Sequence, residues 1–350
     1  MKVRYLKRIH LIILLLLIFP IILGQKKAPG IIGSNIPRKL EYSNYITVKY
    51  KRDASYEKGF NYYNFEYRKE ISYIIYENKN YNQSQSLSIS SGKSIDIHFS
   101  YPIKSLEKFF DGFDVEKNNN CIMSIDFSHF DSSKLENVAY MLFFCNNLES
   151  IDFTNFTTTN IKNMSHMFSA TYALKSIDVS SFNTSLVEDM QNMFGSCNSL
   201  ESLDLSNFDT SSVKDMKSMF RQCTNLKSLD LSNFDTSSVK IMSEMFYECM
   251  DLESIELSKF NTSSVTEMNE MFNFCEKLKS IDVSNFDTSS VTNMNKMFYN
   301  CKALTSLDTS NFKTSSTKDM GYMFNYCEAL TSIDVSNFDT SSVTIYVRLL

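Results

Sequence analysis

The stretch "ESLDLSNFDTSSVKDMKSMFRQC", residues 201–223, contains the pattern that decides the fold. Its tripeptide Leu203-Asp204-Leu205 returns as Leu229-Asp230-Leu231, 26 residues later. An acid recurs at this spacing without an insertion, at Asp126, Asp152, Asp178, Asp204, Asp230, Glu256, Asp282, Asp308 and Asp334. A repeat of fixed length predicts a stacked array, because one short unit cannot bury its own apolar side.

Two hydrophobic periods follow one another inside each unit. Apolar and polar residues alternate over residues 202–206, which predicts a strand with one solvated face. From Val213 the apolar spacing becomes i, i+3, i+6 and i+7, which is typical of one face of a helix. The intervening "DTSS" supplies turn residues, and Ser212 with Asp215 fits a capping box. We therefore expect one strand, one turn and one helix per 26-residue unit.

The expected fold class is an α/β solenoid, a curved array with one short parallel β-strand and one helix per repeat. Parallel strands stack about 4.8 Å apart, whereas helices are about 10 Å wide. This difference predicts curvature, with the strands on the concave side.

The repeat resembles that of a known family. The signature "LxSLDLSNFDTSSVxxMxxMFxxC", present for example at residues 226–249, resembles the BspA-like leucine-rich repeats, or 26-residue bacterial surface protein repeats. The resemblance covers roughly residues 120–350. It implies a secreted or cell-surface protein with a leucine-rich-repeat type of solenoid, for which binding and adhesion are the usual proposed roles. It supplies no catalytic residues to carry over.

Residues 1–24 have the pattern of a secretory signal peptide. Four basic residues precede an apolar run, Ile9–Leu23, and Gly24 offers a cleavage position. The run is shorter than the roughly 20 residues that a spanning helix needs. We expect cleavage and a secreted or extracellular cell-surface location. The alternative is an uncleaved membrane anchor, which would be the chain's contact with a membrane.

The rest of the chain divides into three segments. Residues 25–93 are basic and rich in Tyr, Asn and Lys, and they favour a small β cap or a stalk. Residues 94–119 have the pattern of a degenerate N-terminal capping repeat. Residues 120–350 form about nine repeats, of which the last is divergent or incomplete; its Val343, Tyr346, Leu349 and Leu350 keep the apolar register.

Charge argues against a nucleic-acid partner. Residues 94–350 carry 19 Lys and Arg against 34 Asp and Glu, a balance of −15. Proteins that bind nucleic acids neutralise phosphates with basic residues, so an acidic array of this kind is unsuited to that role.

The row of central acids is the main candidate site. Stacking in register brings neighbouring carboxylates about 4.8 Å apart, which costs roughly 1 kcal/mol per pair in water. One interpretation is a solvated structural ladder in which flanking serines donate hydrogen bonds; the alternatives are a ligand-binding face and a row of divalent cations. The binding interpretation predicts ligand contacts from Asp178, Ser202, Asp204, Ser206, Ser228, Asp230, Ser232, Glu256 and Asp282.

A second row lies three residues before each acid. Its charges alternate over six units, at Glu149, Lys175, Glu201, Lys227, Glu253 and Lys279. Stacking would place opposite charges on successive units, and each exposed pair would contribute about 0.2–1 kcal/mol.

Cysteine also recurs at the repeat spacing, at Cys145, Cys197, Cys223, Cys249, Cys275, Cys301 and Cys327, with Thr171 in place of one. These positions fall on the apolar side, which favours a row of buried thiols over disulfides between neighbours. The methionines fall on the same side, and we expect them in the core. The chain has no CxxC pair and no clustered His, so we expect neither a metal nor another cofactor.

Catalysis finds no support in the sequence, which has no GxSxG, HExxH or P-loop motif. We therefore expect a non-enzymatic repeat protein that binds a protein or glycan on another surface through the concave Ser-Asp-Ser face. The alternative is a self-associating coat or spacer protein with no specific ligand.

Overall fold

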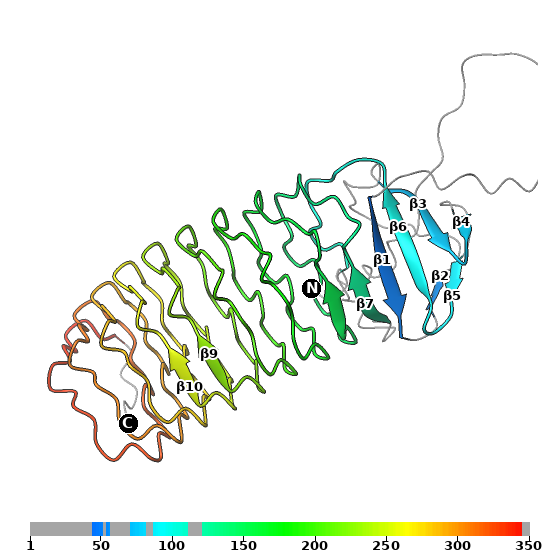
Figure 1. The fold of residues 1–350 in the computed structure, drawn as a ribbon. Helices are drawn as coiled ribbons and strands as arrows, with labels where there is room; N and C mark the ends of the chain where they lie inside the picture. The colour runs from blue at the N-terminus through cyan, green and yellow to red at the C-terminus, as the bar shows by residue number, and fades with distance from the viewer. Residues whose placement is uncertain (1–43, 52–53, 57–70, 82–86, 111–120, 345–350) are drawn as a thin grey trace, which may run out of the picture.

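The computed structural model describes residues 44–51, 54–56, 71–81, 87–110 and 121–344. The predicted signal peptide and the last apolar positions of the final repeat lie outside these residues. The described residues form ten strands: β1 (Tyr45–Tyr50), β2 (Ala54–Tyr56), β3 (Ile71–Tyr76), β4 (Lys79–Tyr81), β5 (Leu87–Ile89), β6 (Ser94–Phe99), β7 (Ile122–Asp126), β8 (Ser150–Asp152), β9 (Ser228–Asp230) and β10 (Ser254–Glu256). Figure 1 shows a β region at one end, followed by stacked coils.

A six-stranded sheet joins the N-terminal segment to the repeats. Its strand order is β4-β3-β6-β1-β7-β8, while β2 and β5 form a separate antiparallel pair. β1 is antiparallel to both β6 and β7, whereas β7 is parallel to β8. β1 alternates half-buried and buried residues, with Ile46, Val48 and Tyr50 in the core. Strand β1 therefore covers the edge of the first repeat strand, which would otherwise have unpaired backbone groups.

The segment that the sequence analysis treats as a degenerate repeat contributes to both regions. Its strand β6 lies between β3 and β1 in the N-terminal sheet. A few residues later, the Leu106 N–H donates to the Asn137 carbonyl at 3.0 Å and the Phe110 N–H to the Met141 carbonyl at 2.8 Å. These are the bonds by which later repeats contact each other.

Each 26-residue unit forms one coil of the stack, which we call a rung. Rungs pair in parallel and in register, for example Leu229 with Ile255 and Ile125 with Ile151. A second row of parallel bridges joins residues eleven positions after the central acid, for example Asp189 with Asp215. Because both sides of a rung pair with the next one, the whole array stacks at β-strand spacing.

The prediction of one helix per repeat is wrong. No helix occurs among the described residues, and the segment from Met216 to Cys223 is a chain of turns. Its N–H groups alternate in their use: Phe220 donates to the Met245 carbonyl of the next rung at 2.9 Å, whereas Met219 closes a turn onto the Met216 carbonyl at 3.2 Å. A helix would instead direct these donors along its own axis to residue i−4.

Backbone dihedrals and ring spacing exclude the helix independently. Ser218 and Gln222 have φ values of 56° and 59°, in the left-handed region that a right-handed helix does not visit. Phe220 stacks on Phe194 and Phe246 with ring centroids 5.9 and 5.6 Å apart. Packed helices need 8–10 Å between their axes, so helices could not follow one another at this spacing. The apolar positions point inward as expected, but turns place them there.

The capping box and the predicted curvature depended on that helix. Oδ1 of Asp215 accepts the Lys217 N–H at 2.8 Å and so closes a local turn. Without helices about twice as wide as the strand spacing, the physical reason for a concave strand side is lost. Figure 1 shows the coils side by side in an elongated array. We therefore call the predicted surface the strand face, meaning the residues from two before to two after each central acid.

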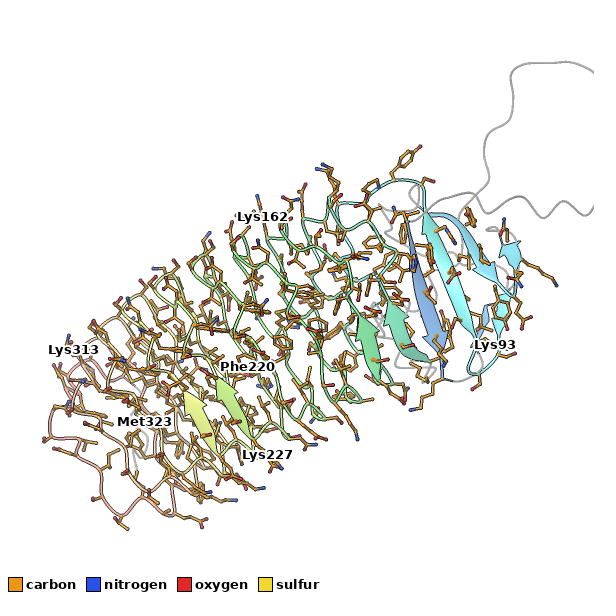
Figure 2. The ribbon with its side chains drawn as sticks, viewed as in Figure 1. Lys93, Lys162, Phe220, Lys227, Lys313 and Met323 are labelled. Carbon is orange, nitrogen blue, oxygen red and sulfur yellow. The ribbon has the colours of Figure 1, made fainter. Side chains whose placement is uncertain are left out.

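The core runs as one continuous column through the rungs. Val213, Met216, Met219, Phe220 and Cys223 are all 0% exposed, and their equivalents in neighbouring rungs are buried with them. Figure 2 shows side chains filling the interior along the array, with Phe220 and Met323 labelled. The prediction that the repeated methionines are core residues is confirmed.

Two rows of polar side chains close the corners of the coil. A buried Thr lies six residues after most of the acids and bonds the next rung; Thr236, for example, donates to the Asn261 carbonyl at 2.9 Å and accepts the Asn261 N–H at 2.8 Å. Three residues after most acids, an Asn reaches back to carbonyls of the preceding rung, as Asn233 does to Leu205 and Phe208. These rows satisfy backbone groups that the corners would otherwise leave unpaired.

Candidate binding surface on the strand face

The strand face brings the predicted site residues together on one surface. Asp178, Asp204, Asp230, Glu256 and Asp282 occupy the same place on five successive rungs and are exposed. Their neighbours Ser202, Ser206 and Ser228 are also exposed, while Ser232 is half-buried. The register of β9 with β10 places Asp230 directly beside Glu256, and Ser228 beside Ser254.

Each central acid has a local structural role. Oδ1 of Asp204 accepts the N–H of Ser206 at 2.9 Å, and Oδ1 of Asp230 accepts the N–H of Ser232 at the same distance. Glu256 repeats the arrangement with Ser258 at 2.8 Å. At the aspartates this is the hydrogen bond of an Asx-turn, which bends the chain out of the strand. The carboxylate row is therefore part of the architecture, whatever else it does.

These hydrogen bonds favour the ionised carboxylates. The backbone and hydroxyl of Ser206 lower the pKa of Asp204, and Ser232 lowers the pKa of Asp230 in the same way. Repulsion from the neighbouring acid acts in the opposite direction: the charge of Asp178 raises the pKa of Asp204, and that of Asp204 raises the pKa of Asp230. The hydrogen bonds outweigh this repulsion, so Asp204 and Asp230 stay ionised at neutral pH.

The serine that follows the acid donates these hydrogen bonds, and the serine that precedes it does not. Ser206 donates to Asp204, whereas the hydroxyl of Ser202 has no side-chain hydrogen bond within the part of the chain that the structure describes. The prediction that both flanking hydroxyls offset the repulsion is therefore right for only one of them. The hydroxyl of Ser202 remains available to a ligand.

Two other rows carry charges of alternating sign and are partly paired. In the row three residues before the acids, Lys279 contacts Glu253 at 2.9 Å. A further row, which sequence reasoning missed, runs ten residues after the acids through Glu136, Lys162, Glu188 and Lys214. In it Lys104 contacts Glu136 at 2.9 Å, and Lys214 pairs with Glu188. Its signal was the same alternation of sign at a spacing of 26 residues.

The central acids differ from both rows in their lack of ion pairs within the described part of the chain. Among the described residues, Asp178, Asp204, Asp230, Glu256 and Asp282 take part in no ion pair with Lys or Arg. The row is thus a line of exposed negative charge at β-strand spacing, flanked by locally compensated charges. Such a surface attracts extended cationic partners.

The described residues contain no group of three or more His, Cys, Asp or Glu side chains arranged to hold a metal ion. The carboxylates of the row run parallel from rung to rung. A calcium ion needs six to eight converging oxygens, which this arrangement does not provide.

The cysteines form a row of buried free thiols, in agreement with the interpretation favoured above. Sγ of Cys249 donates to the Phe220 carbonyl at 3.1 Å, and the same bond recurs one rung later from Cys275 to Phe246 at 3.2 Å. Burial raises the pKa of Cys249 to about 12, which keeps it a neutral thiol. Thr171 stands where another rung has a cysteine, but its hydroxyl donates to the Phe168 carbonyl of its own rung at 2.8 Å.

No helix in the described residues is long and apolar enough to cross a membrane.

The stacked rungs define a repeat protein with a parallel, in-register β architecture. The chain belongs to the family described as "Mycoplasma protein of unknown function, DUF285", whose model matches residues 104–229, 172–280, 218–328 and 274–350. No curated protein matches the chain. Among solved structures, the chain is similar to a leucine-rich repeat protein from Bacteroides ovatus, with 22% identity, a TM-score of 0.31, and coverage of 71% of this chain and 73% of that one.

Proposed function

We propose that this protein is a secreted or cell-surface binding protein whose strand face holds an extended, basic segment of another macromolecule. The observation that carries the proposal is the line of exposed carboxylates, Asp178 to Asp282, that no Lys or Arg of the described chain neutralises. A chain of cations laid along the array would meet one carboxylate on every rung and would relieve the repulsion between neighbours.

The proposed mechanism is multivalent contact. One exposed carboxylate and one cation attract each other by about 1 kcal/mol in water, which is too little to hold a partner. Identical rungs repeat the contact at a fixed spacing, so the contributions accumulate when the partner is itself extended and repetitive. The exposed Ser202 and Ser228 hydroxyls add hydrogen-bonding groups beside the acids.

The location at a surface rests on the sequence. The basic and apolar pattern of residues 1–24 favours export, and the repeat signature resembles that of the BspA-like surface proteins. The location and the membership of that particular family remain predictions.

The experiment compares two variants that lose the same number of negative charges, one on the strand face and one in the neighbouring row of alternating charges. The first changes Asp204, Asp230 and Asp282 to Asn, which keeps the Oδ1 acceptor of each turn. The matched control changes Glu149, Glu201 and Glu253 to Gln, in the row of alternating charges. Binding of a fluorescent oligolysine peptide and of a panel of basic matrix proteins is measured by fluorescence anisotropy at low and high salt, with circular dichroism to check the fold.

We expect the wild type and the Glu-to-Gln control to bind, and the Asp-to-Asn variant to lose at least tenfold in affinity. Binding should weaken as salt rises, because the contacts are exposed. Equal affinities for the two variants would show that the central acids are architectural only, and the proposal would be abandoned.

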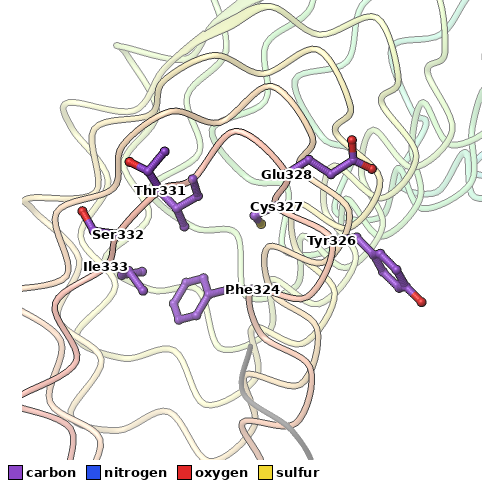
Figure 3. Close-up of a pocket in the computed structure, with 8 residues that line it drawn as sticks. Phe324, Tyr326, Cys327, Glu328, Thr331, Ser332 and Ile333 are labelled. Atoms are coloured by element: carbon purple, nitrogen blue, oxygen red, sulfur yellow. The ribbon is translucent and has the colours of Figure 1, made fainter.

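Self-association is a second candidate function, favoured by the last described coil. A cavity of about 580 Å³ opens there, and Phe324, Leu330 and Ile333 contribute its apolar lining (Figure 3). Leu330 and Ile333 are only half-buried, whereas Leu304, the equivalent of Leu330 one rung earlier, is 0% exposed. If copies associate here, light scattering will show a mass that rises with concentration and that falls to the monomer value in Leu330→Glu. A constant monomer mass for the wild type excludes this candidate.

A further inference from the structure

One edge of the array carries the row of alternating charges that lies three residues before the central acids. In Figure 2, Lys227 of this row lies on the lower edge of the array, whereas Lys162 lies on the upper edge. We call the lower edge the charged edge, meaning the residues six, five and three positions before the acid on the six rungs from Asp152 to Asp282. We propose that the charged edge is an interface at which a second copy of this chain packs side by side and antiparallel. Dimerisation here is independent of the proposed function, because the interface uses none of the strand-face acids.

A tight turn brings these positions to the edge. The Leu226 N–H donates to the Cys223 carbonyl at 3.2 Å, and the two residues between them form the tip of a turn. Lys227 follows this turn directly and is exposed. The equivalent bond occurs on all six rungs of the charged edge. Because the rungs stack in register, the turn tips and the charged residues form two lines along the edge.

The order of the charges makes this edge complementary to itself. Six charges of alternating sign begin with an acid and end with a base, so a two-fold axis between the third and fourth rungs places opposite signs face to face. A slip of one rung would instead oppose like charges, for example Lys175 with Lys227, so the charges also select the register. The facing pairs, each formed twice, are Glu149 with Lys279, Lys175 with Glu253 and Glu201 with Lys227.

The exposed apolar residues of the charged edge follow the same symmetry. Tyr172 is 40% exposed and Met250 is 37% exposed, and each lies at a turn tip six residues before its acid. The axis that pairs the charges relates the rung of Tyr172 to the rung of Met250, so it brings these two side chains together. Charge order and apolar positions therefore favour the same arrangement of the two copies. The other four rungs have polar residues at this position, namely Asn146, Asn198, Thr224 and Glu276.

Most of the charges nearest the axis are available to a second copy. Towards one end of the row, Glu253 is paired within the chain, with Lys279 at 2.9 Å. The other three of the four central charges are exposed and take part in no ion pair among the described residues; they are Lys175, Glu201 and Lys227. A second copy supplies an opposite charge to each of them.

The proposed contact is a narrow strip. Six rungs at a spacing of about 4.8 Å span about 29 Å along the array. A strip of this kind falls at the low end of the sizes of protein–protein interfaces, so the dimer should form only at high protein concentration. Its ion pairs are exposed, so the dimer should dissociate as salt screens them.

The test changes the centre of the charged edge in the full chain. Glu201→Lys places like charges face to face across the axis, beside Lys227 of the second copy. The double variant, Glu201→Lys with Lys227→Glu, restores opposite charges there. Tyr172→Asn removes the exposed ring and introduces the residue that the chain uses at the same position in Asn146 and Asn198. Sedimentation velocity measures the mass over a wide range of concentration at low and high salt.

Three controls change other surfaces. Glu188→Lys makes the same charge reversal in the row that contains Lys162, on the opposite edge. Tyr101→Asn removes a ring that is 66% exposed elsewhere. Leu330→Glu changes the apolar lining of the last described coil. Circular dichroism checks that each variant keeps the fold of the wild type.

We expect the wild type and the three controls to form a dimer whose fraction rises with concentration and falls with salt. Glu201→Lys should raise the dissociation constant of the dimer at least tenfold, and Tyr172→Asn should also raise it. The double variant should recover most of the affinity, which a role of Glu201 within its own chain would not predict.

The proposal is overturned if the wild type stays a monomer at every concentration, or if Glu201→Lys dimerises as tightly as the wild type. It is also overturned if the double variant is as weak as Glu201→Lys. Loss of the dimer in Glu188→Lys or Leu330→Glu, with Glu201→Lys unaffected, would assign self-association to the opposite edge or to the last coil.

Discussion

Thr184 and Asp209, on neighbouring rungs, hold each other by two hydrogen bonds: the Thr184 hydroxyl donates to the Asp209 carbonyl at 2.8 Å and accepts the Asp209 N–H at 2.8 Å. Thr184 is 0% exposed, so both bonds are shielded from water. The equivalent Thr of nearly every rung does the same, and the row replaces the backbone ladder where the coil turns its corner.

Replacement of Thr184 by Val should lower the free energy of unfolding by about 2 kcal/mol, because Val keeps the shape but leaves a buried N–H and a buried carbonyl unpaired. Thr184→Ser should cost less, since Ser132 performs the same task by accepting the Thr157 N–H at 2.6 Å. Urea unfolding of the two variants measures the difference. A Thr184→Val variant as stable as the wild type would mean that the hydroxyl contributes nothing to stability.

The Asx-turn at Asp204 predicts a difference between Asn and Ala at this position. Asp204→Asn keeps an oxygen for the Ser206 N–H and should leave the unfolding midpoint nearly unchanged, whereas Asp204→Ala should lower it. Thermal unfolding, monitored by circular dichroism, compares the midpoints of the two variants with that of the wild type. If both variants unfold at the same temperature as the wild type, the turn does not depend on the acid.

The same hydrogen bonds predict how stability depends on acid pH. The pKa values of Asp204, Asp230 and Asp282 are lower in the folded chain than in the unfolded one, chiefly because of hydrogen bonds from the following serine. Their stabilising effect is therefore complete above the unfolded pKa, about 4, and is lost as the pH falls through the folded values. The triple Asp-to-Asn variant should show a flatter profile of urea midpoint against pH below about 4. If the urea midpoint of the variant falls with pH as steeply as that of the wild type, the acid sensitivity does not come from these carboxylates.

Cysteine reactivity should vary along the thiol row. Burial raises the pKa of Cys197 and Cys249 to about 12, whereas a hydrogen bond with Cys301 lowers the pKa of Cys327, which is also 9% exposed. Since the thiolate is the reactive form, iodoacetamide should label Cys327 first in the native protein. Mass spectrometry of timed digests gives the order, with denatured protein as the reference. Labelling of Cys249 as fast as Cys327 would show that the core opens readily.

His98 predicts a pH-sensitive N-terminal sheet. It is 7% exposed and lies between the rings of Tyr45 and Tyr73, and neither of its ring nitrogens has a hydrogen-bond partner among the described residues. Burial lowers its pKa despite the nearby charge of Asp96. Protonation therefore favours the unfolded state, and stability should fall as the pH drops below about 6.5.

His98→Phe should remove this dependence and should be at least as stable as the wild type at neutral pH. Hydrogen exchange of strands β1 and β6 at pH 5 and 7 measures the effect locally. Equal acid sensitivity in the variant would assign it to other groups.

Sequence patterns predicted which residues face inward and which face solvent. The inward positions around Asp204, such as Leu205, Val213 and Phe220, are buried as the 26-residue period requires, and the predicted strand-face acids lie together on the surface. The sequence analysis did not predict the turns of residues 216–223 and their equivalents, because apolar residues three or four positions apart are equally typical of a helix. Non-glycine residues at positive φ, such as Ser218 and Gln222, gave no local signal of their conformation.

By itself, the amino-acid sequence determined the repeat, its register and its core, because burial of apolar side chains follows a period that can be read along one chain. Only the tertiary structure decided the backbone of residues 216–223, since the partners of those N–H groups belong to the next rung. The Phe220 N–H donates to the Met245 carbonyl, 25 residues away. An N–H that bonds the next rung cannot also form the bond to residue i−4 that a helix needs. Tyr247 and Phe274 likewise become neighbours only when the rungs stack.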